Sequence, residues 1–141
     1  MATTRTAHTE WEGNLLDGKG LVTFDSSGAG EFPVSWPARA ETPDGRTSPE
    51  ELIAGAHSAC FSMALAHGLS GAGTPPTRIE TKADVTFQPG TGITGTHLTV
   101  IGTVPGSDEA DFAKAAEDAK ANCPVSQALI GTTITLTASL A

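Results

Sequence analysis

The chain has 141 residues, a formal net charge of −8 from 8 basic and 16 acidic residues, and two cysteines. Its few Lys and Arg residues form no run, which argues against a nucleic-acid partner, and no apolar stretch approaches the ~18 residues of a membrane span. We therefore expect one domain over residues 1–141, a cytoplasmic location with reduced thiols, and no association with membranes.

Residues 8–36 are predicted to form three short strands. HTEWEGNLL leads through Asp17-Gly18, a dipeptide typical of hairpin turns, into GLVTFD, and a glycine-rich turn then leads into EFPVSW. The segment PARAETPDGRT that follows is polar and rich in Pro, Asp and Gly, so it is predicted to be a loop.

A long helix is predicted over residues 48–69, SPEELIAGAHSACFSMALAHGL. Ser48 fits the N-cap, Pro49 fits the first helical position, and Glu51 completes a capping box. One face of this helix, at helical spacing, holds Leu52, Ala56, Cys60, Met63 and His67. Because other apolar residues lie elsewhere around the helix, we expect it to be buried in a core or between subunits.

The rest of the chain is predicted to contain two strands, two helices and a final strand. Alternation over residues 79–87 indicates a strand with one buried face, and ITGTHLTVIGTV forms a second. The segment SDEADFAKAAEDAKANC is typical of a helix capped by Ser107 or Asp108, CPVSQAL of a short helix, and TTITLTASL of a strand. The order βββ-α-ββ-αα-β indicates an α+β fold.

The two cysteines, Cys60 and Cys123, both fall on apolar helix stripes, where a free cysteine most simply serves as a small buried hydrophobe. A reactive cysteine instead needs a nearby positive charge that lowers its pKa. Arg39 and Arg46 lie just before the long helix. Of the two glutamates that open this helix, one is used in the capping box, so Glu50 is predicted to hold an arginine in a bidentate pair.

Both cysteine segments resemble the OsmC/Ohr family, which comprises the osmotically inducible protein C and the organic hydroperoxide resistance proteins. The motifs that carry the resemblance are SPEELIAGAHSACFSMAL and CPVSQAL. Further similar segments are WEGNLLDGKG, TPPTRIETKADVTF, ITGTHLTV and ITLTASL, so the resemblance covers nearly the whole chain in order. It implies an OsmC-like fold with antiparallel sheets, a long buried central helix and an intertwined homodimer.

The resemblance implies a thiol-dependent peroxidase that reduces organic hydroperoxides to alcohols without a metal or an organic cofactor. By position, Cys60 is the peroxide-attacking cysteine, Cys123 the resolving cysteine and Glu50 the acidic residue. Arg39 in PARAE matches the arginine of the OsmC branch, which the chain therefore resembles more than the Ohr branch. Ala40 departs from the family, in which an aromatic residue usually follows this arginine, so the shape of the pocket is expected to differ.

In the implied cycle, Cys60 is held as a thiolate by Arg39, attacks the peroxide and becomes a sulfenic acid, which condenses with Cys123 to a disulfide. An external dithiol, of lipoyl type by analogy with the family, then reduces the disulfide. Ten residues of straight helix span ~15 Å, which is too far for Glu50 to serve Cys60 of its own chain through one arginine. Either the start of the helix is bent, or Glu50 and Arg39 reach the Cys60 of a second subunit, which we favour.

Two further groups of residues lie near Cys60 in sequence. Phe61 and Met63, with Trp36, are candidates to line an apolar pocket for the substrate, although the core is the simpler place for Phe61 and Met63. His57, three residues before Cys60, lies close enough to tune the thiol.

Two other functions fit the same cysteines. The chain is alternatively a redox sensor or ligand-binding stress protein whose thiols respond to oxidation without turnover. A third possibility is a structural dimer with inert buried cysteines.

Overall fold

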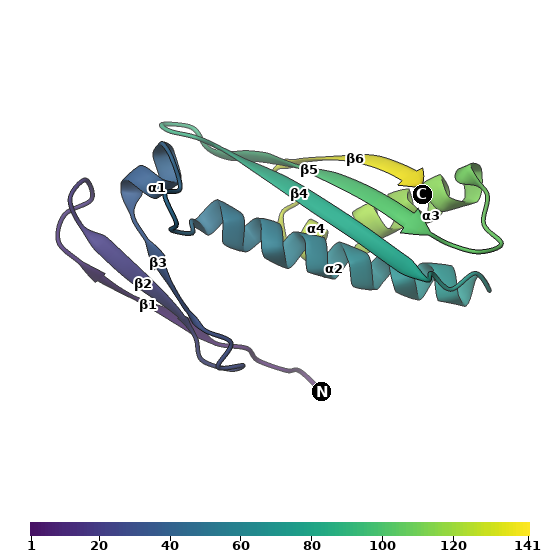
Figure 1. The fold of residues 1–141 in the computed structure, drawn as a ribbon, viewed down its shortest axis with the longest axis horizontal. Coiled ribbons are helices and arrows are strands. Elements are labelled where there is room, and N and C mark those ends of the chain that lie inside the picture. Colours follow the sequence, from purple (N-terminus) through teal and green to yellow (C-terminus); the bar gives the residue numbers. More distant parts are fainter. The chain divides into compact units, whose positions relative to one another are not determined.

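The computed structural model describes all of residues 1–141 (Figure 1). The chain forms two compact units, Met1–Leu52 and Ile53–Ala141. In order, its elements are β1 (Ala7–Glu12), β2 (Lys19–Phe24), β3 (Glu31–Val34), α1 (Trp36–Ala40), α2 (Pro49–Gly71), β4 (Arg78–Gln88), β5 (Gly92–Thr103), α3 (Glu109–Asn122), α4 (Pro124–Ala128) and β6 (Thr133–Leu140).

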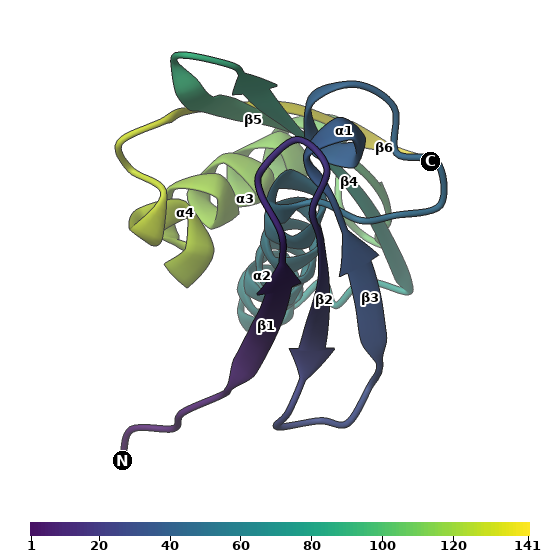
Figure 2. The ribbon, with the colours of Figure 1, turned by 90° about the vertical axis from the view of Figure 1, so that its left-hand side faces the viewer.

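Residues 1–52 contain an antiparallel sheet with the strand order β1-β2-β3, as Figure 2 shows. The predicted hairpin between β1 and β2 is confirmed, but its loop covers residues 13–18. The left-handed residue of this loop is Gly13, with φ 89°, rather than either residue of Asp17-Gly18. This position requires a backbone conformation that glycine adopts without steric cost.

The prediction of an uninterrupted loop after β3 is wrong, because the short helix α1 forms there. Ser35 is its N-cap and accepts a hydrogen bond from the backbone N–H of Ala38 at 3.2 Å. Pro37 lies in the first turn, where a proline costs no intrahelical hydrogen bond. These N-terminal helix signals are present in the sequence, but the Pro, Asp and Gly residues that follow obscured them.

Residues 53–141 contain a second sheet with the order β4-β5-β6. β4 pairs with β5 antiparallel, and its half-buried and exposed residues alternate as predicted. β5 pairs with β6 parallel, so the expectation of purely antiparallel sheets is wrong. A parallel pair requires a long crossover, and α3 and α4 lie in the connection between these two strands.

The core of residues 53–141 is one cluster of apolar side chains from α2, β5 and α3. Along α2 the fully or nearly fully buried stripe consists of His57, Phe61, Leu65 and Leu69. The face that holds Cys60, Met63 and His67 is a different one, since Met63 is 72% exposed and His67 is exposed as well. Periodicity could not select the face because the helix is apolar on nearly all sides.

The buried residues of α2 are this stripe and Glu50, so packing within one chain covers one face of the helix, and burial of its other faces between subunits stays a prediction. By length and mean hydropathy, α2 is the one helix that could cross a membrane. The sequence did not predict this, because the helix contains no uninterrupted apolar run of that length. Its buried stripe belongs to the core of residues 53–141, and 22% of its most apolar 18-residue window is buried.

The predicted caps form in large part. Ser48 accepts a hydrogen bond from the Glu51 backbone N–H at 3.1 Å, which is one half of the capping box. The carboxylate of Glu51 accepts a hydrogen bond from the Thr47 hydroxyl instead of closing the other half. Asp108, one of the two predicted caps of α3, accepts from the Asp111 backbone N–H at 2.8 Å.

Candidate active site

The two cysteine thiols lie next to each other in residues 53–141. Cys60 is in the middle of α2, and Cys123 is at the junction where α3 ends and α4 begins. Both are free thiols that lie near enough to influence each other's ionisation; Cys123 is fully buried, whereas Cys60 is half-buried. The structure thus brings together two residues that are 63 positions apart in sequence.

The surroundings of Cys60 within this unit favour its thiol form. Burial raises the pKa of Cys60, and the hydrogen bond and charge of Cys123 raise it further. The backbone N–H of Val125, in the first turn of α4, acts in the opposite direction and lowers the pKa. No basic side chain is among these groups, so residues 53–141 do not supply the positive charge that would ionise the thiol.

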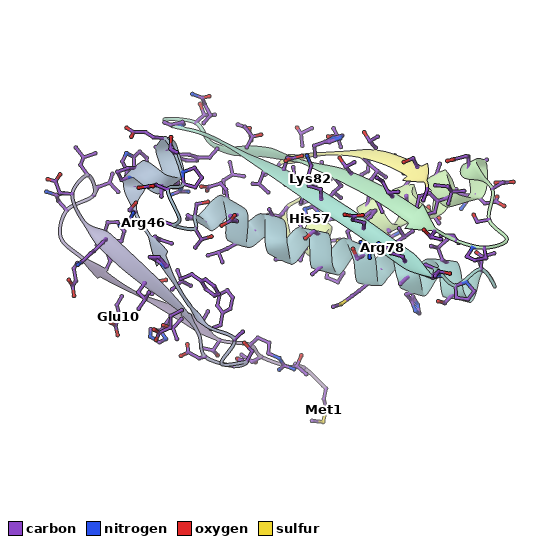
Figure 3. The ribbon with its side chains drawn as sticks, in the orientation of Figure 1. Met1, Glu10, Arg46, His57, Arg78 and Lys82 are labelled. Carbon is purple, nitrogen blue, oxygen red and sulfur yellow. The ribbon has the colours of Figure 1, made fainter.

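Cys123 belongs to a buried chain of hydrogen bonds. Its Sγ accepts from the backbone N–H of Ser126 at 3.3 Å and lies 3.2 Å from the Ser126 hydroxyl. The Ser126 hydroxyl in turn lies 2.7 Å from Nε2 of His57, which Figure 3 labels on α2. Burial lowers the pKa of His57, so its ring is neutral near pH 7. The sequence had placed His57 beside Cys60, but it did not indicate this connection to Ser126 and Cys123.

Arg39 and Glu50 form an ion pair within residues 1–52. Nε of Arg39 donates to Oε1 of Glu50 at 2.9 Å, and Nη2 donates to Oε2 at 2.9 Å. This is the bidentate pair that the sequence predicted, with Arg39 at the end of α1 and Glu50 in the first turn of α2. The Glu50 side chain is 9% exposed and the Arg39 side chain 30%, so the carboxylate is largely shielded from solvent whereas the guanidinium is partly accessible. Arg46, the other cation of this segment, is exposed in the loop between the two helices (Figure 3).

Arg39 also lines an apolar cavity of about 400 Å³ within residues 1–52. The lining includes Trp11 and Trp36, with Leu52 from the start of α2. Trp36 had been expected in an apolar pocket, and the structure adds Trp11 to the lining. No sequence signal linked Trp11 to Arg39, because their proximity depends on how the sheet carries α1.

The two residues predicted to bind substrate lie in different surroundings. Phe61 has no exposed surface and belongs to the core of residues 53–141, so a substrate would reach it only after a rearrangement of that core. Met63 is 72% exposed. The roles assigned to Phe61, Met63, Cys60, Cys123, Arg39 and Glu50 remain predictions at this point.

Comparison with known proteins places the chain in a family. The model of the OsmC-like protein family matches residues 42–139. The chain is 45% identical over 122 residues to the peroxiredoxin OsmC of Escherichia coli, covering 84% of this chain and 85% of that protein, and equally similar to the peroxiredoxin OsmC of Shigella flexneri.

Solved structures share the fold over the full chain. An organic hydroperoxide resistance protein from Elizabethkingia anophelis is 26% identical, with a TM-score of 0.69 over 100% of this chain and 99% of that one. The OsmC protein of Legionella pneumophila, 20% identical, has a TM-score of 0.70 over 99% of each chain. An α+β fold with two small sheets and a long helix, two neighbouring free thiols and these matches together show that the chain belongs to the OsmC-like protein family.

Proposed function

We propose that this protein is a thiol-dependent peroxidase that reduces organic hydroperoxides to alcohols. The observation that carries the proposal is the contact between the Cys60 and Cys123 thiols, in a chain 45% identical to a peroxiredoxin OsmC. A fold shared with an organic hydroperoxide resistance protein supports the substrate class. A half-buried thiol beside a fully buried one fits an attacking and a resolving cysteine.

The reaction divides into three balanced steps. The Cys60 thiolate attacks the terminal oxygen of ROOH, the O–O bond breaks, and RO⁻ takes up a proton and leaves as ROH. Cys60 is left as a sulfenic acid. Cys123 attacks this sulfur, a disulfide forms and one water is released. An external dithiol, for which we propose the lipoyl type, then reduces the disulfide by exchange.

The thiolate required for the first step needs a cation, and Arg39 is the one we propose. Glu50 holds Nε and Nη2 of Arg39 and so sets the direction of the guanidinium plane. A guanidinium aimed at the sulfur lowers the pKa of the thiol that burial has raised, and it stabilises negative charge on the peroxide oxygens as their bond breaks.

We further propose that Arg39 and Glu50 of one subunit act on Cys60 of a second subunit. Glu50 and Cys60 are ten positions apart on α2, and ten residues of helix span ~15 Å. The exposed apolar side chains of α2, Met63 among them, support burial against a second copy. Such a homodimer has two equivalent sites.

The dimer proposal is tested by mixing two inactive variants. Cys60→Ser chains and Arg39→Lys chains are unfolded together and refolded as a mixture. If the residues act across the dimer, each mixed dimer regains one intact site, and about a quarter of the wild-type activity returns. If they act within one chain, no site is intact and no activity returns. Sedimentation of the wild-type protein gives the oligomeric state independently.

The peroxidase proposal is tested by counting thiols. Cumene hydroperoxide is added to the reduced protein, followed by dihydrolipoamide, and thiols and cumyl alcohol are measured at each stage. We expect two thiols to disappear per alcohol formed and to return with the dithiol, over many cycles. Cys60→Ser is expected to form no alcohol, and Cys123→Ser to form one equivalent and stop.

Other outcomes identify the alternatives. Thiols that are lost once and never recovered by the dithiol would indicate a redox sensor. Thiols that do not react with the peroxide would contradict the peroxidase proposal and leave two inert core cysteines.

A further inference from the structure

The hydrogen bonds around Cys123 form a chain that ends at a buried base. His57 Nε2 lies 2.7 Å from the Ser126 hydroxyl, and this hydroxyl lies 3.2 Å from the Cys123 sulfur. The exposed fractions of His57, Ser126 and Cys123 are 0%, 4% and 0%. The chain joins the middle of α2 to the first turn of α4, and the peroxidase cycle described above assigns no role to His57 or Ser126.

A fully buried thiol needs an internal acceptor for its proton. Cys123 must lose its proton as it forms the disulfide, because only the thiolate attacks another sulfur. Since Cys123 has no exposed surface, bulk water cannot take that proton directly. The neighbouring groups with lone pairs are the Cys60 sulfur, which is the atom under attack, and the Ser126 hydroxyl.

His57 has the properties of a temporary acceptor. Burial is the one influence that shifts the pKa of its ring, so no charged side chain from the sheet, α2, α3 or α4 biases it. The titratable groups near it are the two thiols, Cys60 one turn along α2 and Cys123 beyond Ser126. Because Nε2 must accept, the neutral ring carries its hydrogen on Nδ1, which is buried without a partner. Protonation of Nε2 brings no partner to Nδ1, so this side of the ring does not stabilise the imidazolium and the added proton is released readily.

We propose that Ser126 and His57 form a proton relay that activates Cys123 for the resolving step. The S–H bond of Cys123 breaks, its proton moves to Ser126 Oγ, and the Ser126 proton moves to His57 Nε2. The Cys123 sulfur forms the S–S bond with Cys60, and the S–O bond of the sulfenic acid breaks. The leaving hydroxide takes up one proton, His57 returns to its neutral form, and the products are a disulfide and one water.

In this step Cys60 is reduced from the sulfenic to the disulfide level and Cys123 is oxidised from thiol to disulfide, so no further oxidant is needed. The backbone N–H of Ser126, 3.3 Å from the Cys123 sulfur, stabilises the charge that develops there. Ser126 is thus a catalytic residue of the resolving step, and His57 is a positioning residue that acts through it. The inference rests on the proposed function for the identity of the oxidised Cys60.

The test isolates the resolving step from peroxide chemistry. Dithiobis-nitrobenzoate is added to the reduced protein in equimolar amount, and Cys60 releases one thionitrobenzoate as it forms a mixed disulfide. Attack by Cys123 then releases a second thionitrobenzoate, which is observed directly by its absorbance. The same second step is followed after one equivalent of cumene hydroperoxide, by quenching with an alkylating agent and counting sulfenic acid and disulfide by mass.

His57→Gln keeps a group that can hydrogen-bond to Ser126 but removes the basic nitrogen. We expect the second release to slow by ~10²-fold, the range for loss of a general base, while the first release changes less than about twofold. His67→Gln, at an exposed position of the same helix, is the matched control and should resolve at the wild-type rate. Ser126→Ala should slow the second release as His57→Gln does, and Ser126→Thr, which keeps a hydroxyl, should restore most of it.

The pH profile separates a relay from a purely structural role. The wild-type resolving rate should fall only below the lowered pKa of His57 and be flat above it. In His57→Gln the rate should follow the thiolate fraction alone, which rises about tenfold per pH unit below a thiol pKa. Melting curves of each variant report its folding.

A folded His57→Gln protein that resolves at the wild-type rate, with the wild-type profile, would overturn the relay. If the wild-type protein instead shows the histidine-dependent second release but no reaction with hydroperoxide, the relay stands and the peroxidase proposal fails.

Discussion

Residues 53–141 bury ten apolar side chains in one cluster, whereas the buried apolar side chains of residues 1–52 are Val22 and Ala38 alone. Burial of apolar surface is the main stabilising contribution to a fold, so the first unit has little core of its own. Exposed apolar residues in it include Trp11, Leu15, Leu16, Leu21 and Phe32. In the homodimer proposed above, the second copy would cover these exposed side chains.

The same two regions also differ in their chemistry. Residues 53–141 contain the two thiols, and burial there raises the pKa of Cys60. Residues 1–52 contain the ordered cation, Arg39, which Glu50 holds. Under the proposal that Arg39 activates Cys60, the cation therefore comes from residues 1–52 and the sulfur from residues 53–141.

The largest expected effect concerns the unequal cores. Phe112→Ala removes a fully buried ring from the cluster of residues 53–141 and is expected to lower the free energy of unfolding by ~3–5 kcal/mol. Val22→Ala removes two carbons from a residue that is 8% exposed and should cost less than about 2 kcal/mol. Urea unfolding of both variants measures the difference. Equal losses would show that residues 1–52 are packed as firmly as residues 53–141.

The next effect concerns the division between cation and thiol. Arg39→Lys keeps the charge but loses the bidentate grip of Glu50, and we expect kcat/KM for cumene hydroperoxide to fall by ~10²-fold. The pKa of Cys60, measured from the pH dependence of its alkylation by iodoacetamide, should rise in this variant. Arg46→Lys, a change at an exposed cation, is the control and should leave both quantities unchanged. If only Arg46→Lys lowers the rate, Arg46 is the cation that serves the thiol.

The smallest effect is a difference in pH dependence between two histidines. Burial lowers the pKa of His57 in the folded protein below 6.5, so below pH 6.5 the unfolded chain takes up a proton that the folded chain does not. The stability of the wild type therefore falls as pH drops through this range, by at most about 1.4 kcal/mol per pH unit, and His57→Gln should remove this loss.

His8 is expected to act with the opposite sign. Its hydrogen bond with Asp25, at 2.8 Å, and the charge of that carboxylate raise the pKa of His8 above 6.5. Its contribution to stability is therefore fully present below pH 6.5 and is lost as pH rises through the raised value. His8→Gln should lower stability near pH 5 and leave it unchanged near pH 8.5. Urea midpoints of both variants at the two pH values decide whether the signs differ.

Several parts of the site could be predicted from local sequence because their causes are local. Ser48 and Pro49 set the start of α2, and the alternation over residues 79–87 set the faces of β4. The pairing of Glu50 with Arg39 also followed from few candidates, since the chain has only 8 basic residues.

Other features could not be predicted, because they depend on contacts between distant segments. The buried face of α2 belongs to one cluster with side chains of β5 and α3, and no periodicity distinguished this face in a helix that is apolar on nearly all sides. The parallel pairing of β5 with β6 depends on the crossover through α3 and α4. The hydrogen bond between His57 and Ser126 joins residues 69 positions apart.

By itself, the sequence determined the order of the elements, the caps of the long helix, the residue types that thiol chemistry needs and, through its motifs, the family. Only the tertiary structure decided which helix face is buried and that the Cys123 thiol lies next to Cys60. It also decided that the neutral ring of His57 is linked to Cys123 through the Ser126 hydroxyl. The physical reason is that capping and strand alternation act over a few residues of chain. The burial of a helix face, the pKa of a thiol or a histidine and the proximity of the two sulfurs depend instead on side chains that are distant in sequence. These side chains pack together in the fold and exclude water there.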